Sequence, residues 1–319
     1  MTEMKTALLR GLLASAAALG LSTAAAAAPA PTSADIVKAA EGRIPQFMSC
    51  LREQKVALVG AHRGGPLAEH PENSTVTFDF TTSLAPVFIE TDVQQTFDGV
   101  LFMNHDGVLD RNTTGHGVIA EQPWARIAKL KQRDPTGQPV DQSPQTLAEV
   151  LAFAKDRVLL LLDVKPQTDA GLLMAEVDKA GAGGRVMFLA YTVPQAQALR
   201  RAKPDAVLAL PVFDREQLAK AKAAGLVDGK LLAMVRPGDV DATFVPDLEA
   251  LGATVMSGTY ASAKSPDALY RTRADAALYQ SFAQQGPRLM VSNRPLAAAE
   301  AMLADPTYAR RLQACGVGR

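Results

Sequence analysis

Four apolar runs in the first 165 residues of this 319-residue chain each end in polar residues of a kind that does chemistry. The endings read Ala-His-Arg-Gly-Gly (61–65), Ile-Glu-Thr-Asp (89–92), Met-Asn-His-Asp (103–106) and Leu-Asp-Val-Lys (162–165). One charged residue after a strand is usually a solvated loop residue. Four such endings in succession predict that two histidines, at least three carboxylates, an arginine and a lysine share one site.

The carboxylates in these endings predict a metal ion. Glu90 and Asp92 are two residues apart on a strand, so their side chains project to the same face. Two like charges on an inward face repel and are costly to bury, and a hard cation relieves that cost. Asp163 could supply a third oxygen ligand. We therefore expect one divalent cation, Mg²⁺ or Ca²⁺; the alternative is a pair of exposed acids at a strand end.

The two histidines are candidates for acid/base catalysis. An imidazole with a pKa of about 6.5 can both take and give a proton near neutral pH, which suits His62 and His105 to this work. Either residue alone could also be a core histidine bonded to backbone. Arg63 and Lys165 add positive charge of the kind that binds a phosphate group.

The elements that must position these residues alternate between strands and helices. Uniformly apolar runs of strand length are separated by helical stretches such as 194–202, 215–224 and 241–251. The strand-length runs lie at 56–61, 87–89, 100–103, 158–162, 186–190, 206–210, 231–235, 254–256 and 289–291. This alternation predicts a parallel sheet covered on both faces. A (β/α)₈ barrel of the TIM type is the leading fold, with an open doubly wound sheet as the alternative.

Two irregularities modify the expected barrel. Only about eight residues separate Asp92 from the next apolar run, too few for a crossover helix. The segment 107–143 is long, polar and rich in Gly, Pro and Thr, which predicts an insertion at the barrel mouth after the third strand. We expect the barrel domain to span residues 55–319.

The N-terminus has the pattern of an export signal. Lys5 and Arg10 precede an apolar run at 11–21 and an alanine tract at 24–28. A membrane anchor is the alternative, but the run is shorter than the roughly 20 residues that span a bilayer. We expect a signal peptide over 1–28, a linker and N-terminal helix in 29–54, no stable membrane span, and a periplasmic or secreted protein.

Export changes the interpretation of the two cysteines. Cys50 and Cys315 lie near opposite ends of the mature chain, and disulfides persist outside the cytoplasm. The first and last elements of a barrel are neighbours, so a Cys50–Cys315 disulfide is a candidate; two inert buried thiols are the alternative. The spacing of these cysteines does not suggest a zinc site.

The composition limits the class of partner. Lys plus Arg and Asp plus Glu number 33 each, so the net charge is zero and no broad positive field favours nucleic acid. Aromatic residues make up only 5% of the chain, too few to suggest stacking platforms for bases or long sugar chains. A small molecule is the expected partner.

Several ordered motifs resemble those of the glycerophosphodiester phosphodiesterase family. They read His-Arg-Gly (62–64), Pro-Glu-Asn-Ser (71–74), Glu-Thr-Asp-Val (90–93), Thr-Phe-Asp-Gly (96–99), His-Asp (105–106) and Leu-Asp-Arg-Asn-Thr-Thr-Gly-His-Gly (109–117). The resemblance is strongest over 56–117 and weaker through 146–165 and 289–295. It implies a TIM-type barrel, a divalent metal, and hydrolysis of glycerol-linked phosphodiesters to glycerol phosphate and an alcohol.

The resemblance also implies roles for single residues. On it, Glu90 and Asp92 fall on metal-ligand positions, His62 and His105 on the acid/base pair, and Arg63 on a phosphate-contacting position. Lys165 falls on the lysine of a family motif that here reads Asp163-Val164-Lys165. Supporting positions are Glu72 and Asn73 beside the first histidine and Asp106 after the second.

Asp163 departs from the family pattern, where glutamate is usual. Aspartate is one methylene shorter, so the metal would sit nearer that strand or bind through water. The sphingomyelinase D-like phospholipases are similar in carrying aspartate there, which shifts the expected substrate more than the chemistry.

The resemblance implies a two-step path. One histidine would remove a proton from a substrate hydroxyl that attacks phosphorus to give a cyclic phosphate, and the other would protonate the leaving alcohol. Phospholipase D-like hydrolysis of lysophospholipids or sphingolipids is one alternative, and a non-catalytic phosphate-binding barrel is another. Side chains after the later strands do not define the substrate: Tyr191, Phe213, Arg236, Tyr260 and Asn293.

Overall fold

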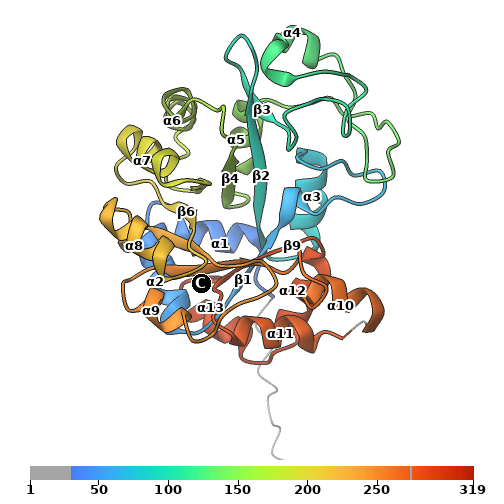
Figure 1. The fold of residues 1–319 in the computed structure, drawn as a ribbon. Helices are drawn as coiled ribbons and strands as arrows, with labels where there is room; N and C mark the ends of the chain where they lie inside the picture. Colours follow the sequence, from blue (N-terminus) through green and yellow to red (C-terminus); the bar gives the residue numbers. More distant parts are fainter. Residues whose placement is uncertain (1–29, 274) are drawn as a thin grey trace, which may run out of the picture.

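Eight parallel strands close into a barrel in the computed structural model, which describes residues 30–273 and 275–319 (Figure 1). The barrel strands are β1 (Leu58–Ala61), β2 (Val87–Gln95), β4 (Leu160–Val164), β5 (Val186–Leu189), β6 (Leu208–Pro211), β7 (Leu231–Met234), β8 (Thr254–Gly258) and β9 (Leu289–Ser292). β1 pairs with both β9 and β2, which closes the ring. The predicted TIM-type barrel is confirmed, and the open doubly wound alternative is wrong.

Helices cover the outside of the barrel, which is why its strands are apolar on both faces. They are α3 (Thr75–Leu84), α5 (Leu147–Ala154), α6 (Ala170–Lys179), α7 (Val193–Ala202), α8 (Arg215–Ala223), α9 (Val245–Glu249), α10 (Pro266–Arg273), α11 (Ala277–Gln284) and α12 (Pro295–Leu303). Four of them begin at a side chain that accepts a backbone N–H of the first turn: Thr146, Asp169, Thr192 and Asp214. These caps fix where each crossover helix starts after its strand.

The third apolar run, β3 (Leu101–Met103), corrects one step of the sequence reasoning because it is not a barrel strand. It pairs antiparallel with the outer part of β2, with Met103 opposite Val93. The eight-residue spacing after Asp92 is therefore a hairpin, in which β2 leaves the barrel and β3 returns to it (Figure 1). The N–H of Asn104 donates to the carbonyl of Asp92 at 3.1 Å, so the return of the chain brings the next residue, His105, to the mouth.

The segment 107–143 packs on this hairpin around a small apolar cluster of its own. Its regular elements are η2 (Ile119–Glu121) and α4 (Trp124–Ile127), beside the far end of β2 in Figure 1. The fully buried members of the cluster are Phe102, Leu109, Ile119 and Ile127. The N–H of Trp124 donates to Asp98 at the hairpin turn, at 2.9 Å.

The N-terminal segment forms two helices, so the single helix expected within 29–54 is wrong. α1 (Ser33–Ala40) ends at a turn in which Gly42 has a φ of 74°, a conformation that glycine adopts at little cost. α2 (Ile44–Glu53) then starts with Pro45 in its first turn. The signal peptide predicted for 1–28 lies outside the described residues.

A disulfide joins Cys50 of α2 to Cys315, which follows the last helix, α13 (Tyr308–Ala314). The Tyr308 hydroxyl donates to the carbonyl of Ala57 at 2.9 Å, so the two chain ends meet just before β1 begins. This is the pairing expected from a closed barrel. In the described part of the chain, none of the helices has the length and apolar character needed to cross a bilayer.

Removal of this disulfide is expected to destabilise the fold. The double variant Cys50→Ala/Cys315→Ala should lose about 2–5 kcal/mol of unfolding free energy, because the bridge closes a long loop in the unfolded chain. Urea unfolding followed by circular dichroism measures the loss, and reduced wild-type protein, as the control, should unfold at the midpoint of the variant. Equal thiol titration of denatured protein with and without reductant would show that the bridge is absent.

Candidate active site at the barrel mouth

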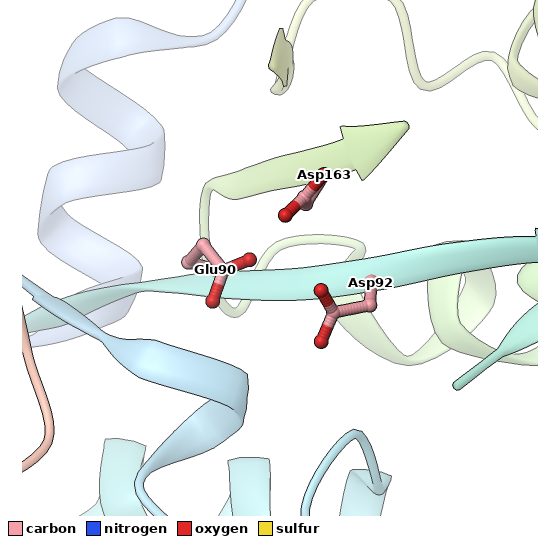
Figure 2. Close-up of side chains that lie close together, drawn as sticks. All are labelled: Glu90, Asp92 and Asp163. Atoms are coloured by element: carbon pink, nitrogen blue, oxygen red, sulfur yellow. The ribbon is translucent and has the colours of Figure 1, made fainter. Parts of the chain in front are cut away.

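Three buried carboxylates lie together at the mouth of the barrel: Glu90 and Asp92 on β2, and Asp163 on β4 (Figure 2). One oxygen of each lies within 4.8 Å of the others. Asp92 and Asp163 are direct partners in the β2–β4 register, and Glu90 lies two residues earlier on the same face. Such a group of like charges is costly to bury without compensating positive charge.

Lys165 supplies part of that positive charge. Its Nζ lies 2.6 Å from Oδ1 of Asp92 and 3.0 Å from Oδ2 of Asp163. The Tyr191 hydroxyl, from the loop after β5, donates to the same Asp163 oxygen at 2.5 Å. Although burial acts in the opposite direction, attraction from Asp92 and Asp163 raises the pKa of Lys165, so its ammonium stays charged.

The pKa values of the three carboxyl groups are shifted in different directions. Burial, together with repulsion from Asp92 and Asp163, raises the pKa of Glu90 well above its usual range. Burial and Asp92 raise the pKa of Asp163 to about 6. For Asp92 burial acts in the same sense, but attraction from Lys165 and then His105 outweighs it and lowers the pKa. Asp92 is therefore the carboxylate most firmly held in its charged form.

The donor set fits a hard cation. Three carboxylates offer the oxygen ligands that Mg²⁺ and Ca²⁺ prefer. Oδ1 of Asp163 is buried and has no hydrogen-bond partner within the described residues. An oxygen left in that state loses its hydration without replacement, and a bound cation would restore the lost interaction. The cluster therefore offers a metal site.

A sharp turn after β1 directs His62 and Arg63 at this cluster. Arg63 and Gly64 both have positive φ angles, 51° and 86°, within the short η1 (His62–Gly64). A Cβ on Gly64 would lie 2.4 Å from the ring of Phe78, so only glycine fits there. As a result, the N–H of Arg63 donates to Oε2 of Glu90 at 2.9 Å.

Two residues from the last barrel strands hold His62. Its Nδ1 lies 2.5 Å from Oδ1 of Asn293, which follows β9, and its ring stacks on Tyr260, which follows β8, with centroids 4.6 Å apart. An amide oxygen only accepts, so Nδ1 carries the proton and Nε2, 3.9 Å from Glu90, is free to take one. Burial and the charge of Arg63 lower the pKa of His62 to about 4, which keeps the ring neutral.

A carboxylate orients the second histidine. Nδ1 of His105 lies 2.6 Å from Oδ1 of Asp106, and Arg111 donates its Nε to the other Asp106 oxygen at 2.6 Å. Although burial acts to raise it, the bonds from Arg111 and His105 lower the pKa of Asp106 to about 2. Asp106 is thus an anion that fixes the His105 ring. The Gln94 side chain steadies the loop by donating to the carbonyls of both residues, at 3.2 and 2.9 Å.

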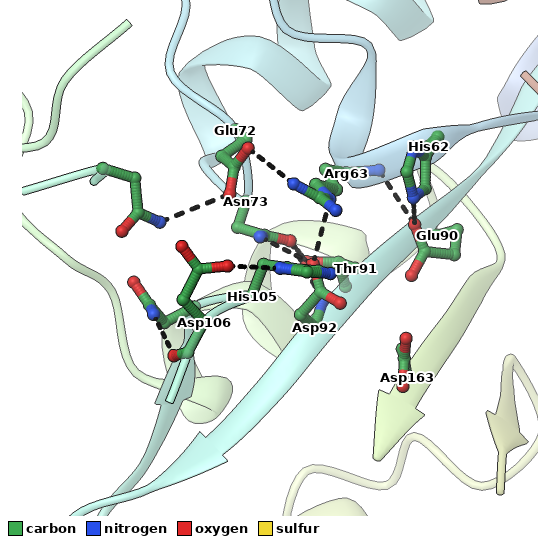
Figure 3. Close-up of polar contacts among 12 residues, drawn as sticks. His62, Arg63, Glu72, Asn73, Glu90, Thr91, Asp92, His105, Asp106 and Asp163 are labelled. Atoms are coloured by element: carbon green, nitrogen blue, oxygen red, sulfur yellow. Dashed lines mark hydrogen bonds and ion pairs between the residues drawn. The ribbon is translucent and has the colours of Figure 1, made fainter. Parts of the chain in front are cut away.

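Glu72 and Asn73 connect the residues around His62 with those around His105 (Figure 3). Glu72 accepts two hydrogen bonds from Arg111, at 2.6 and 2.9 Å, and one from Arg63 at 3.0 Å. Asn73 is buried, donates to Oδ2 of Asp92 at 2.8 Å, and accepts the N–H of Asp92 at 3.0 Å. Arg63, beside His62, and Arg111, which holds Asp106 beside His105, thus share Glu72, and the neighbouring Asn73 is bonded to Asp92 of β2.

The ten predicted site residues lie in one connected network at the mouth. They are His62, Arg63, Glu72, Asn73, Glu90, Asp92, His105, Asp106, Asp163 and Lys165. Sequence reasoning does not single out Arg111, whose signal is a lone arginine inside a loop rich in Asn, Thr and Gly. It also does not find Asp267, which is buried and accepts the N–H of Asn293 at 2.8 Å. The guanidinium carbon of Arg236 lies 5.4 Å from the centroid of the Phe213 ring.

Comparisons with known proteins agree with this geometry. The model of the glycerophosphoryl diester phosphodiesterase family matches residues 62–211. A glycerophosphodiester phosphodiesterase of Bacillus subtilis is 27% identical over 56% of this chain and 66% of its own length. One from Caldanaerobacter subterraneus is 35% identical over 33% of this chain and 43% of its own length. The chain thus covers less than two thirds of either relative.

Solved structures share the fold. A glycerophosphoryl diester phosphodiesterase from Parabacteroides distasonis superposes with a TM-score of 0.70 at 22% identity, covering 87% of this chain and 93% of that chain. A phosphodiesterase from Oleispira antarctica, in complex with the product sn-glycerol-3-phosphate, superposes with a TM-score of 0.63 at 20% identity. That match covers 77% of this chain and 96% of the other.

The three-carboxylate cluster predicts the behaviour of a Glu90→Gln variant. Loss of one buried negative charge should raise the stability of the metal-free protein, because burial and repulsion from Asp92 and Asp163 raise the pKa of Glu90. The same change should remove most of the stabilisation that Mg²⁺ or Ca²⁺ gives. Thermal unfolding with and without each ion measures both effects, and the exposed Glu121→Gln is the matched control. An ion-induced shift in Glu90→Gln as large as that of wild type would contradict the ligand assignment.

Proposed function

The chain belongs to the glycerophosphodiester phosphodiesterase family, and from this premise we propose that it hydrolyses glycerophosphodiesters to glycerol phosphate and an alcohol. One observation carries the proposal. Two histidines, each held at Nδ1 by its own acceptor, lie beside the carboxylate cluster (Figure 3). The glycerol phosphate product bound by the Oleispira antarctica phosphodiesterase supports the same substrate class.

We propose that one divalent cation, Mg²⁺ or Ca²⁺, completes the site. Glu90, Asp92 and Asp163 would hold it, and it would supply charge that polarises a phosphoryl oxygen. Arg63 and Lys165 lie beside the same carboxylates, so their positive charge faces the same space. Charge placed before the reaction, where negative charge grows during it, is usually the largest contribution to such catalysis.

The histidines would move the protons. One histidine removes a proton from a glycerol hydroxyl next to the phosphate. The oxygen of that hydroxyl then bonds to phosphorus, and the bond between phosphorus and the oxygen of the leaving alcohol breaks. The other gives its proton to that alcohol oxygen, and a cyclic phosphate is left. Water then opens the ring, with the two histidines in exchanged roles. In both rings the Nδ1 contact leaves Nε2 as the atom that exchanges the proton.

Phospholipase D-like hydrolysis of lysophospholipids is a second candidate. Aspartate at position 163 favours it, and so do two exposed apolar side chains near the barrel mouth, Leu67 and Tyr191. A lipid substrate needs such a surface for its acyl chain. A barrel that binds phosphate without hydrolysis is the third candidate.

We propose that the protein works outside the cytoplasm, in the periplasm or as a secreted enzyme. The charged and apolar pattern of residues 1–28 supports export. The Cys50–Cys315 bridge fits the same compartment, since cytosolic thiols are kept reduced. N-terminal sequencing of protein recovered from the cell envelope would test this, and an uncleaved cytosolic product would contradict it.

A panel of substrates separates the three candidate functions. The enzyme should hydrolyse glycerophosphocholine at least ~10-fold faster than lysophosphatidylcholine, because both histidines and the cluster face a polar mouth. Activity should disappear with a chelator and return with Mg²⁺ or Ca²⁺. Faster cleavage of the lysolipid would favour the second candidate, and binding without chelator-sensitive hydrolysis would favour the third.

Replacement of either histidine should abolish turnover without unfolding the protein. His62→Ala and His105→Ala are each expected to lower kcat by about 10²–10⁴-fold, the usual contribution of a positioned acid or base. Circular dichroism and the cation-induced thermal shift should stay as in wild type. His116→Ala, an exposed loop histidine, is the matched control. Full activity of His62→Ala with the cation still bound would overturn the assignment.

A further inference from the structure

A cavity of about 750 Å³ adjoins the catalytic histidine His62. Tyr260, which stacks on the His62 ring, and Asn293, which bonds its Nδ1, both line this cavity. Gly65, just after His62, lies on its wall as well. The cavity therefore lies next to His62, separated from it by Tyr260 and Asn293, among the loops that follow β1, β8 and β9.

Two arginines give this cavity a positive wall. Arg271 of α10 and Arg294 after β9 both line it, and neither forms an ion pair with a carboxylate in the described ranges. The lining holds one acid, Asp267, whose carboxylate is already used. Its Oδ1 accepts the hydroxyls of Tyr279 and Ser292, at 2.9 and 2.8 Å, and its Oδ2 accepts the N–H of Asn293.

Most other side chains that line the cavity are small, which leaves room for a ligand. They include alanines at positions 261, 263, 268 and 297 and the hydroxyl-bearing Ser262 and Ser265, beside the larger Leu67 and Leu296. The volume is much larger than one glycerol phosphate needs, in a range typical of pockets for small organic ligands. A guanidinium presents planar donors that match a phosphate or carboxylate.

We propose that this cavity binds the alcohol half of the substrate, and that Arg271 and Arg294 select an alcohol that carries a negative charge. A second phosphate or a carboxylate on the alcohol would provide that charge. The glycerol half is uncharged apart from the phosphate under attack, so it gains nothing from these arginines. An acyl chain would not use them either, and a choline head group would be repelled. This inference rests on the proposed function and narrows its substrate class.

The test compares two diesters that differ in one charged group: glycerophosphoglycerol and the same compound with a terminal phosphate on its alcohol. Wild-type enzyme with saturating Mg²⁺ or Ca²⁺ should show a kcat/KM about 10-fold or more higher for the phosphorylated compound. The preference should shrink at high salt, because exposed charges are screened. In Arg271→Gln/Arg294→Gln the ratio of the two kcat/KM values should fall to about 1.

The matched control is Arg310→Gln, which removes an exposed arginine of α13 at the opposite end of the barrel and should keep the wild-type ratio. Equal kcat/KM values for the two diesters in wild type, or a ratio unchanged in the double variant, would overturn the inference and leave the proposed function intact. Failure of wild type to hydrolyse any diester would instead remove the proposed function.

Discussion

The burial of three carboxylates at one point of the barrel mouth constrains the rest of the site. Glu90, Asp92 and Asp163 converge because two neighbouring strands place acids in register and on one face. Their repulsion must be offset, and the surrounding groups do so in sequence: Lys165 against two of them, the N–H of Arg63 against Glu90, and the Asn73 amide against Asp92. Each of these contacts comes from an N–H donor or a cation. The positive φ angles in the turn at 62–65 and at Asn73 direct these donors toward the carboxylates.

The barrel alone would not assemble the second half of the site. Its strands end in sequence around the mouth, which places Asp163 directly and His62 with the help of the turn at 62–65. His105 needs the β2–β3 hairpin, in which one strand leaves the barrel and its partner returns beside Asp92. The 107–143 segment then supplies Arg111, which joins Asp106 to Glu72 and so ties the returning strand to the loop after β1. An irregularity in the fold thus carries one of the two candidate catalytic groups.

The sequence predicts the parts of this arrangement that depend on local pattern. Period-two spacing places Glu90 and Asp92 on one face, and apolar runs bounded by polar endings identify the barrel strands. The sequence does not predict the parts that depend on long-range packing. The antiparallel direction of β3 is one example, because three apolar residues look alike in either direction. Asp267 is another: it lies on a helix, and only the folded chain brings it under Asn293. The break at Gly42 was open to prediction, since glycine followed by Pro45 is a common interruption of helices.

The charges within the network lead to one further step. Its carboxylates are Glu72, Glu90, Asp92, Asp106 and Asp163, and its permanent cations are Arg63, Arg111 and Lys165. Leaving the histidines aside, five ionised acids and three cations give this network two net negative charges, which one divalent cation would balance. The pKa values of the acids follow burial and the nearest cations: those of Glu90 and Asp163 are raised, chiefly by burial. Asp92 and Asp106, each paired with a cation, have lowered values. A divalent cation held by Glu90, Asp92 and Asp163 would favour the charged form of all three and so lower the raised pKa values of Glu90 and Asp163.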